Sequence, residues 1–217
     1  MPLTKKTIVL DLDHTFITTQ HDMPKDSQLF QSICSNVSLY AVRTRLYKLK
    51  LLDMADDNSI KLGLGTERVM WGLMRNHSYE FLAFCQEYFD KIIVWSAGRK
   101  LYVHQLVDIL FKDLNMPFAI LTYDDMLDSN GKYDCVKRLS KISKTYNIPL
   151  EQIIIIDDNE DTFTENPNNA IHIPVYFKKL NTENITEDET SFLTIKDWLM
   201  REEVINCSDF ALIKKPF

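Results

Sequence analysis

Two short acidic motifs in this sequence could bind a cation. Asp11-Leu12-Asp13-His14-Thr15 follows one apolar run, and Asp157-Asp158-Asn159 follows another. Alternate residues of a strand point to the same side, so Asp11 and Asp13 should face the same way where their strand ends. Carboxylates gathered at one sheet edge repel each other, and a hard divalent cation such as Mg²⁺ would relieve that repulsion. Taken alone, the first motif is equally typical of a turn or a helix cap.

The apolar runs before these motifs belong to a repeating pattern of strands and helices. Short β-branched runs without polar alternation predict strands buried on both faces of a parallel sheet. With amphipathic helices between them, they predict an α/β, Rossmann-like three-layer fold whose ligands bind beyond the carboxyl ends of the strands. The expected strands are residues 7–11, 92–96, 118–122, 153–157 and 171–175, and the expected helices are residues 78–89, 100–114, 135–146 and 191–203.

The segment from about residue 20 to residue 74 interrupts this pattern. Residues 39–52 and 59–64 have the composition of strands on either side of a turn-rich stretch, which predicts a small β-hairpin, cap-like insertion. No repeat or linker divides the chain, so we expect a single domain over residues 1–217, with a C-terminal helix and tail from about residue 190. Residues 206–217 are expected to be a loosely docked tail.

Four segments in chain order resemble the motifs of the haloacid-dehalogenase superfamily of phosphotransferases. The similar segments are Asp11-Leu12-Asp13-His14-Thr15 for the first motif, Ser96 for the second, Lys137 near the start of an expected helix for the third, and Asp157-Asp158 for the fourth. A rival acidic pair, Asp124-Asp125, also follows an apolar run. Because the fourth motif must follow the lysine and this pair precedes Lys137, the pair is expected in a surface loop.

A more specific resemblance is to the RNA polymerase II C-terminal-domain phosphatases, also called NLI-interacting-factor-like phosphatases. Val136-Lys137-Arg138-Leu139-Ser140 is similar to that family's V-K-D-L-S, and Asn166-Pro167-Asn168-Asn169-Ala170-Ile171 is similar to its H-P-D-N-A-V. Residues 75–82 resemble its R-P-x-x-x-x-F-L, with Asn76 in place of the proline. The resemblance covers about residues 5–178 and weakens over residues 20–73.

The resemblance implies a role for each matching residue. Asp11 would attack phosphorus and form an aspartyl-phosphate, and Asp13 would protonate the leaving oxygen and later activate water. Ser96 would hold a phosphoryl oxygen, and Lys137 would neutralise charge. The implied cofactor is Mg²⁺, and which of the two acids of the fourth motif binds it directly is left open. The candidate ligands are Asp11, the backbone carbonyl of Asp13, Asp157 and Asp158.

Several of these residues also have ordinary structural explanations. Lys137 lies among other basic residues, and a basic helix face is usually just solvated. Ser96 could cap a helix that begins near Arg99, and His14 is expected to be an exposed loop residue. Thr15 is grouped with the substrate-binding candidates, although a hydrogen bond from its side chain to the backbone of the first motif would also explain it.

Arg43, Arg45 and Tyr47 are further candidates for binding substrate. They belong to a run that alternates basic residues with aromatic ones, and such a surface could dock an acidic phosphopeptide. The alternative is a strand that simply shows its charges to solvent.

Three functions are compatible with these residues. The leading hypothesis is a Mg²⁺-dependent phosphoserine or phosphothreonine protein phosphatase, with the RNA polymerase II C-terminal tail as a candidate substrate. A second hypothesis keeps the chemistry but changes the substrate to a nucleotide, a nucleic-acid 3′-phosphate or a small metabolite. A third is a non-catalytic scaffold of the same fold, against which the completeness of the motifs argues.

Composition narrows the classes of partner. The 217 residues include 25 Lys and Arg against 31 Asp and Glu, a net charge of −6 that argues against direct binding of nucleic acid through overall charge. No apolar run reaches the roughly 18 residues of a membrane helix, and the N-terminal residues do not resemble a secretion signal. We therefore expect an intracellular protein, nuclear or cytoplasmic, and we expect it to be a monomer. The resemblance implies that its partner is a phosphorylated protein or peptide.

Overall fold

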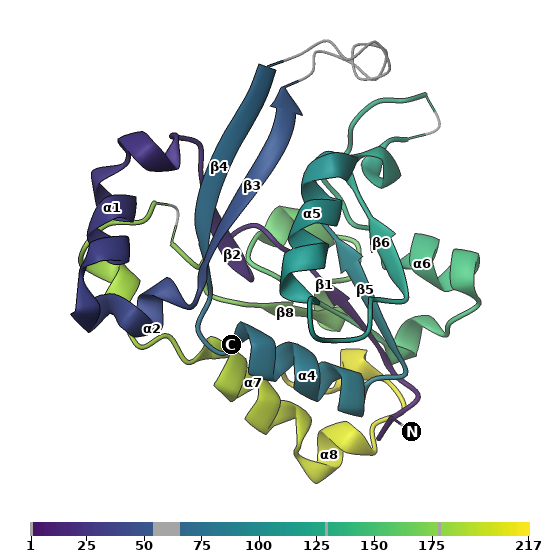
Figure 1. Cartoon of the computed structure of the whole chain (residues 1–217). Coiled ribbons are helices and arrows are strands. Elements are labelled where there is room, and N and C mark those ends of the chain that lie inside the picture. The colour runs from purple at the N-terminus through teal and green to yellow at the C-terminus, as the bar shows by residue number, and fades with distance from the viewer. Residues whose placement is uncertain (1, 54–65, 129, 178) are drawn as a thin grey trace.

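The computed structural model describes residues 2–53, 66–128, 130–177 and 179–217. Its centre is a sheet of five parallel strands in the order β6-β5-β1-β7-β8 (Figure 1). Because all five strands run the same way, their carboxyl ends meet at one edge of the sheet. The strands are β1 Thr7–Leu10, β5 Lys91–Trp95, β6 Ala119–Leu121, β7 Ile153–Asp157 and β8 Ala170–His172.

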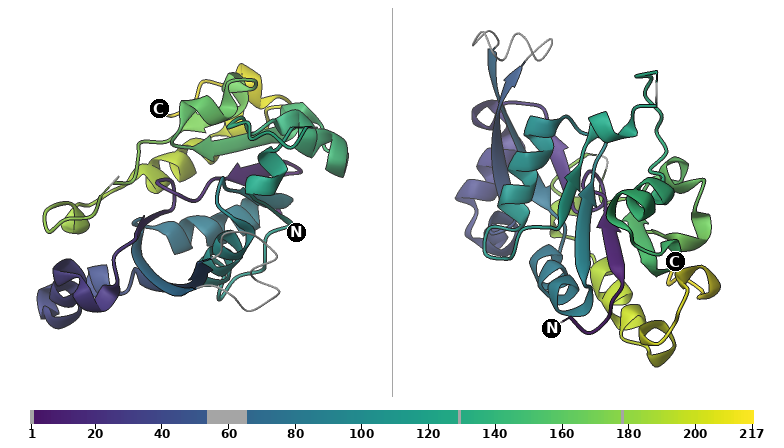
Figure 2. Two further views of the ribbon diagram at one scale, coloured as in Figure 1. Left: turned by 90° about the horizontal axis from the view of Figure 1, so that it is seen from above. Right: turned by 90° about the vertical axis from the view of Figure 1, so that its right-hand side faces the viewer.

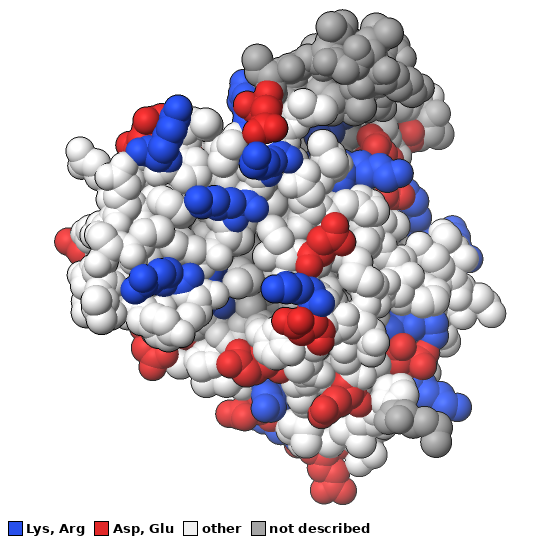
Figure 3. Space-filling view, in the orientation of Figure 1, with Lys and Arg blue, Asp and Glu red and all other residues white. Residues whose placement is uncertain are grey.

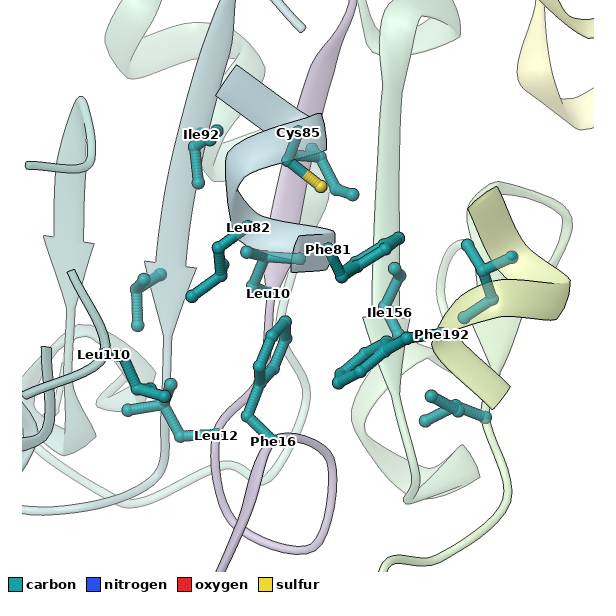
Figure 4. Packing of buried hydrophobic residues seen from close by; sticks show 14 of the residues in the cluster. Leu10, Leu12, Phe16, Phe81, Leu82, Cys85, Ile92, Leu110, Ile156 and Phe192 are labelled. Atoms are coloured by element: carbon teal, nitrogen blue, oxygen red, sulfur yellow. The ribbon is translucent and has the colours of Figure 1, made fainter. Parts of the chain in front are cut away.

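Helices cover both faces of this sheet, which confirms the expected three-layer fold. One face packs against α4 (Ser78–Tyr88), α5 (Lys100–Leu110) and α7 (Ser191–Leu199), and the other packs against α6 (Leu139–Tyr146). Figure 4 shows Phe16, Phe81 and Phe192 meeting on the first face, where the rings of Phe81 and Phe192 stack with centroids 4.6 Å apart. Burying each such side chain stabilises the fold by roughly 1.5–3 kcal/mol.

A second, antiparallel sheet carries the insertion. It consists of β2 (Ile17–Gln20), β4 (Thr66–Met74) and β3 (Leu46–Asp53), in the order β2-β4-β3. One face of this small sheet packs on the main core through Tyr47, Leu49 and Met70, and the other face packs against α1 (Gln28–Ser35) and α2 (Tyr40–Arg43). Figures 1 and 2 show the small sheet between these two helices and α5.

The insertion differs from the expected hairpin. The run expected as one strand over residues 39–52 is helical at its start, and β3 begins only at Leu46. Helix α1 was not expected; it begins where the Ser27 side chain accepts a hydrogen bond from the Phe30 backbone, and it buries Ile33. The expected strand over residues 59–64 lies outside the described residues.

The C-terminal segment is packed rather than loosely docked. Phe210 is fully buried, and the Trp198 indole donates a hydrogen bond to the Lys214 carbonyl at 2.8 Å. The Lys215 ammonium donates to the carbonyls of Asn168, Phe210 and Ile213. Within the described part of the chain, no helix is long and apolar enough to cross a membrane.

The described residues also form several short helices. These are the α-helix α8 Glu202–Ile205 and the 3-10 helices η1 Pro24–Asp26, η2 Val37–Leu39, η3 Tyr123–Met126, η4 Leu150–Gln152, η5 Glu160–Phe163, η6 Pro167–Asn169, η7 Asn184–Thr186 and η8 Phe210–Leu212.

Candidate active site

A cavity of about 420 Å³ opens at the carboxyl ends of β1 and β7. This is the edge at which open parallel sheets bind their ligands. The first motif, the third-motif lysine and the fourth motif all reach it. Its lining residues are Asp11, Asp13, His14, Ala97, Lys137, Asp157, Asp158, Asn159, Thr162 and Val175.

Lys137 lies at the base of this cavity between two carboxylates. Its ammonium donates to Asp11 Oδ1 at 2.5 Å and to Asp157 Oδ2 at 2.7 Å, and its side chain is only 1% exposed. The lysine does not belong to a solvated helix face: α6 starts two residues later, and the Lys137 backbone N–H donates to the Thr162 carbonyl instead. Burial alone would lower the pKa of Lys137, but Asp11 and Asp157 outweigh it and raise that pKa, so the ammonium stays charged.

Three carboxylates near Lys137 could hold a metal ion. One oxygen each from Asp11, Asp157 and Asp158 can be chosen so that the three lie within 4.8 Å of one another. Burial raises the pKa of Asp11 against the opposing effect of Lys137, and burial together with Asp157 raises the pKa of Asp158. One ammonium does not balance these carboxylates, and an all-oxygen donor set is the kind that Mg²⁺ prefers. These residues therefore fit a magnesium ion.

The Asp13 carboxylate lies outside that group of three, in a different environment. Its Oδ1 accepts a hydrogen bond from the Tyr102 hydroxyl at 2.5 Å, and its Oδ2 lies 3.4 Å from the Ser96 hydroxyl. Burial raises the pKa of Asp13, partly against the hydrogen bond from Tyr102. Two carboxylates of one motif thus have different neighbours, which is the arrangement that lets one act as nucleophile and the other as acid.

The turn after Asp13 is held in a left-handed conformation. His14 has φ 61°, which is uncommon for a residue with a side chain, and its backbone N–H donates to the Ile17 carbonyl. The Thr15 hydroxyl lies 3.3 Å from Asp158 Oδ1, so it joins the first motif to the fourth through a side chain and not through the backbone bond that was expected. The Thr15 carbonyl accepts a hydrogen bond from the buried Arg75 guanidinium at 2.9 Å.

Ser96 and the rival acidic pair have clear positions. Ser96 follows β5 at the same sheet edge, and its hydroxyl accepts a hydrogen bond from the Gly98 backbone at 3.0 Å, ahead of the first turn of α5. Asp124 and Asp125 lie in η3, where the Asp125 side chain accepts a hydrogen bond from the Thr122 backbone. The pair is not part of the carboxylate group near Lys137.

The structure does not bring Arg43, Arg45 or Tyr47 to line the cavity. Because residues 40–43 are helical, Arg43 turns back onto the last turn of α1, where it donates to the Cys34 carbonyl at 3.0 Å. Tyr47 is 5% exposed and packs inside the core. Arg45 holds the base of the insertion together through hydrogen bonds to the Met74 carbonyl, the Asn76 side chain, the Tyr176 hydroxyl and the Ile185 carbonyl.

A second cavity of about 500 Å³ continues from the first, between the small sheet and α5. Apolar side chains of Leu51, Met70 and Leu101 form much of its wall, and Arg99 contributes a guanidinium. Trp71 is 1% exposed and packs against Phe30 on the opposite face of the sheet. The remaining lining residues are Asp13, His14, Thr19, His21, Leu52, Arg68 and Tyr102.

Sequence reasoning missed Tyr102, which donates to Asp13 Oδ1, and Thr19, which is hydrogen-bonded to Tyr102. Tyr102 is in the first turn of α5, the helix that follows Ser96. A usable signal existed: a helix that starts at the carboxyl edge of a parallel sheet places its first turn beside the ligand site. Thr19 carries no such signal, because only the pairing of β2 with β4 decides where it lies.

Comparison with known proteins agrees with this geometry. Two solved structures share the fold, each with a TM-score of 0.62 at 18% sequence identity. One is the fission yeast RNA polymerase II CTD phosphatase Fcp1 bound to beryllium fluoride, and the other is Fcp1, described as an essential RNA polymerase II CTD phosphatase. The alignments cover 91% of this chain but only 52% and 50% of those chains, so this chain spans about half their length. No curated protein matches the chain significantly. The profile of the NLI interacting factor-like phosphatase family matches residues 6–202, and the chain therefore belongs to this family of haloacid-dehalogenase-type phosphatases.

Proposed function

We propose that this chain is a Mg²⁺-dependent phosphoserine or phosphothreonine protein phosphatase that works through an aspartyl-phosphate on Asp11. The observation that carries the proposal is the position of Lys137, buried between Asp11 and Asp157 at the base of an open cavity. A buried ammonium beside a carboxylate nucleophile is suited to a substrate that brings further negative charge. The same cavity offers Asp13 as a second carboxylate with separate neighbours.

The residues of the chain divide the reaction between them. An Asp11 oxygen forms a bond to phosphorus while the bond from phosphorus to the serine or threonine oxygen breaks, and Asp13 gives its proton to that leaving oxygen. Asp13 then takes a proton from water as the water oxygen attacks phosphorus, which releases inorganic phosphate and restores Asp11. Lys137 and the Ser96 hydroxyl stabilise the charge on the phosphoryl oxygens without forming bonds to phosphorus.

The metal site completes this arrangement. Asp11, Asp157 and Asp158 would hold Mg²⁺, which when bound supplies positive charge that offsets the repulsion between the carboxylates and a phosphate dianion. Thr15 keeps Asp158 beside the first motif through its hydroxyl. The insertion and the C-terminal segment act with this core as one unit, because both contribute buried side chains to it.

A protein substrate, with the RNA polymerase II tail as the first candidate, is favoured over a nucleotide or a nucleic acid. The two Fcp1 structures are of phosphatases that act on that tail. In this chain the cavity beside Asp13 has an apolar wall, which suits the side chains of a peptide. On the face shown in Figure 3, the described Lys and Arg residues are interspersed with acidic and uncharged residues and form no continuous basic patch of the kind that binds nucleic acid.

Phosphate release tests the proposal. The substrates are polymerase-tail repeat peptides phosphorylated on either the second or the fifth residue of the repeat, together with p-nitrophenyl phosphate, each with Mg²⁺ and with EDTA. Peptide turnover that needs Mg²⁺ and disappears in Asp11→Asn supports the proposal. Hydrolysis of p-nitrophenyl phosphate alone would retain the chemistry and remove the peptide substrate. A lack of hydrolysis of every substrate would favour a scaffold.

A further inference from the structure

A chain of hydrogen bonds links the small sheet to Asp13. The Tyr47 hydroxyl on β3 lies 2.7 Å from the Thr19 hydroxyl on β2, and Thr19 lies 2.7 Å from the Tyr102 hydroxyl on α5. Tyr102 in turn donates to Asp13 Oδ1 at 2.5 Å. Three hydroxyl groups from three different elements therefore form one series of hydrogen bonds, and the last of them, Tyr102, contacts the carboxylate oxygen.

The carboxylate fixes the direction of this chain. Each hydroxyl has one proton to donate, and Tyr102 uses its proton on Asp13 Oδ1. The Tyr102 oxygen must then accept from Thr19, and the Thr19 oxygen must accept from Tyr47. Hydrogen bonds that all point the same way strengthen one another, so each hydroxyl makes the next a better donor.

We propose that Tyr102 is a positioning residue that holds Asp13 so that Oδ2 is the oxygen exchanging a proton with the substrate, and that Thr19 and Tyr47 support it from the small sheet. The inference rests on the proposed phosphatase function, in which Asp13 is the acid and base. It adds a residue and an oxygen assignment to that function.

The surroundings of Asp13 favour this assignment. Tyr102 donates to Oδ1. Among the described residues, Oδ2 has only the Ser96 hydroxyl at 3.4 Å, a long contact that a substrate could replace. Tyr102 and Asp13 both line the second cavity, so the phenol is at the site itself. Burial and the adjacent Asp13 carboxylate raise the pKa of Tyr102, which keeps the phenol a donor throughout.

The small sheet has room for the Tyr47 ring at the far end of this series of hydrogen bonds. Gly72 pairs with Tyr47 across β3 and β4, and a Cβ at Gly72 would lie 2.3 Å from the Tyr47 hydroxyl and 2.4 Å from the Thr18 carbonyl oxygen. A side chain at this position would require the Tyr47 ring or the β2 backbone to shift. Either shift would disturb the contact between Tyr47 and Thr19, so the absence of a side chain at Gly72 is compatible with that hydrogen bond.

The proton accounting gives the inference a specific consequence. In the first step the proton on Asp13 Oδ2 passes to the leaving oxygen, and in the second step Oδ2 receives a proton from water, while Tyr102 keeps its own proton. A serine or threonine alkoxide needs that proton, whereas p-nitrophenolate leaves readily without it. Loss of the Tyr102 hydroxyl should therefore harm alkyl substrates more than activated aryl ones.

The test measures kcat/KM of Tyr102→Phe on p-nitrophenyl phosphate, phenyl phosphate and a phosphoserine peptide. This constant includes departure of the leaving group but not the later hydrolysis that all substrates share. We expect a loss of roughly 10- to 100-fold on the peptide and less than about threefold on p-nitrophenyl phosphate, because a general acid contributes about 10²-fold or more to such a step. Phenyl phosphate should lie between the two.

Further variants keep the result decisive. Thr19→Val should give the same order of substrates with smaller losses of kcat/KM, and Tyr47→Phe should give smaller losses still. The control is Tyr79→Phe, at a 51% exposed position, which should match wild type. Equal losses on all substrates, or no loss in Tyr102→Phe and Thr19→Val, would overturn the inference and leave the phosphatase function standing. If Tyr102→Phe fails to fold, Thr19→Val alone decides. A wild-type chain that hydrolyses none of the substrates would overturn the function itself.

Discussion

Replacing Lys137 by methionine should destabilise the chain strongly when no divalent cation is present. The substitution keeps the length of a side chain that is 1% exposed but removes the ammonium that lies 2.5 Å from Asp11 and 2.7 Å from Asp157. Taking one partner from a buried ion pair leaves an uncompensated charge and costs about 3–5 kcal/mol. For a chain of this length, about 2–4 °C per kcal/mol converts that cost into a fall in Tm of roughly 6–20 °C in EDTA.

Magnesium should reverse part of this loss. With Lys137 gone, the group formed by Asp11, Asp157 and Asp158 carries more uncompensated negative charge, so a divalent cation should stabilise the variant more than the wild type. At a cation concentration 100 times its dissociation constant, binding adds about 2.7 kcal/mol to the free energy of unfolding. Activity should stay at least about 100-fold below wild type even then, because the charge that stabilises the transferred phosphoryl group is missing.

Thermal unfolding in EDTA and in Mg²⁺ checks both parts of this prediction. The matched control is Lys141→Met: Lys141 is 44% exposed and lies 3.6 Å from Asp125, so its loss should cost no more than about 1 kcal/mol. Adding Asp157→Asn to Lys137→Met removes one of the unpaired carboxylates and should restore part of the lost stability. A Lys137→Met chain as stable as wild type in EDTA, with unchanged activity, would refute this account of the site.

Three further substitutions test other parts of the structure. Burial opposes ionisation of Glu189, but hydrogen bonds from Arg75 and Ser191 outweigh burial and lower the pKa of Glu189. The ionised carboxylate therefore stabilises the fold above the unfolded pKa of about 4.3, and this stabilisation is lost as pH falls through the folded pKa. Glu189→Gln should lower the free energy of unfolding by about 1–3 kcal/mol at pH 7, and denaturant titrations at acidic pH should show a smaller difference from wild type. Phe210→Ala should cost about 3–5 kcal/mol by the same assay, and a cost near zero would mean that the C-terminal segment is not packed. Gly72→Ala places a Cβ 2.3 Å from the Tyr47 hydroxyl and should lower the free energy of unfolding by about 1–3 kcal/mol, which a lower Tm would show. It should also reduce kcat/KM on a phosphoserine peptide. An unchanged Tm together with an unchanged kcat/KM would refute the close fit.

The main sheet could be predicted because burial on both faces leaves a direct mark on the sequence. The run at residues 153–157 became β7 with the predicted bounds, and every one of its residues is buried. The expected helices at 78–89 and 100–114 correspond to α4 and α5, which begin at the predicted residues. In each case the apolar residues whose pattern identifies the element are also the residues whose burial stabilises it.

The insertion could not be predicted in the same way. Alternating charges over residues 43–50 suggested a continuous strand, but the alternation applies only from Leu46 onward, where Tyr47 and Leu49 turn inward and Lys48 turns outward. Before it, packing of Ile33 and Val42 beside Trp71 decides for helices. These contacts come from segments distant in sequence, which a local pattern does not contain.

The candidate site shows the same division between local and distant information. Asp11, Ser96 and Asp157 come at or directly after strand ends, so the order of strands was enough to place them together. Arg45 and Tyr47 were chosen by residue type, and the structure gives both of them internal partners. Residue type alone does not say whether a polar group meets the substrate or another part of the chain.

Asp11 and Asp13 are held in the site by different kinds of neighbour, and this difference matters for the reaction. Lys137, a full positive charge, stands beside Asp11 and favours its ionised form, which is what a nucleophile requires. Asp13 is held chiefly by the neutral hydroxyl of Tyr102, which can donate to Oδ1 whether or not Oδ2 carries a proton. An ammonium in that position would keep Asp13 ionised and deprive the leaving group of its proton. A neutral donor supported from the small sheet fixes the orientation of Asp13 while leaving it able to change its charge twice in each turnover.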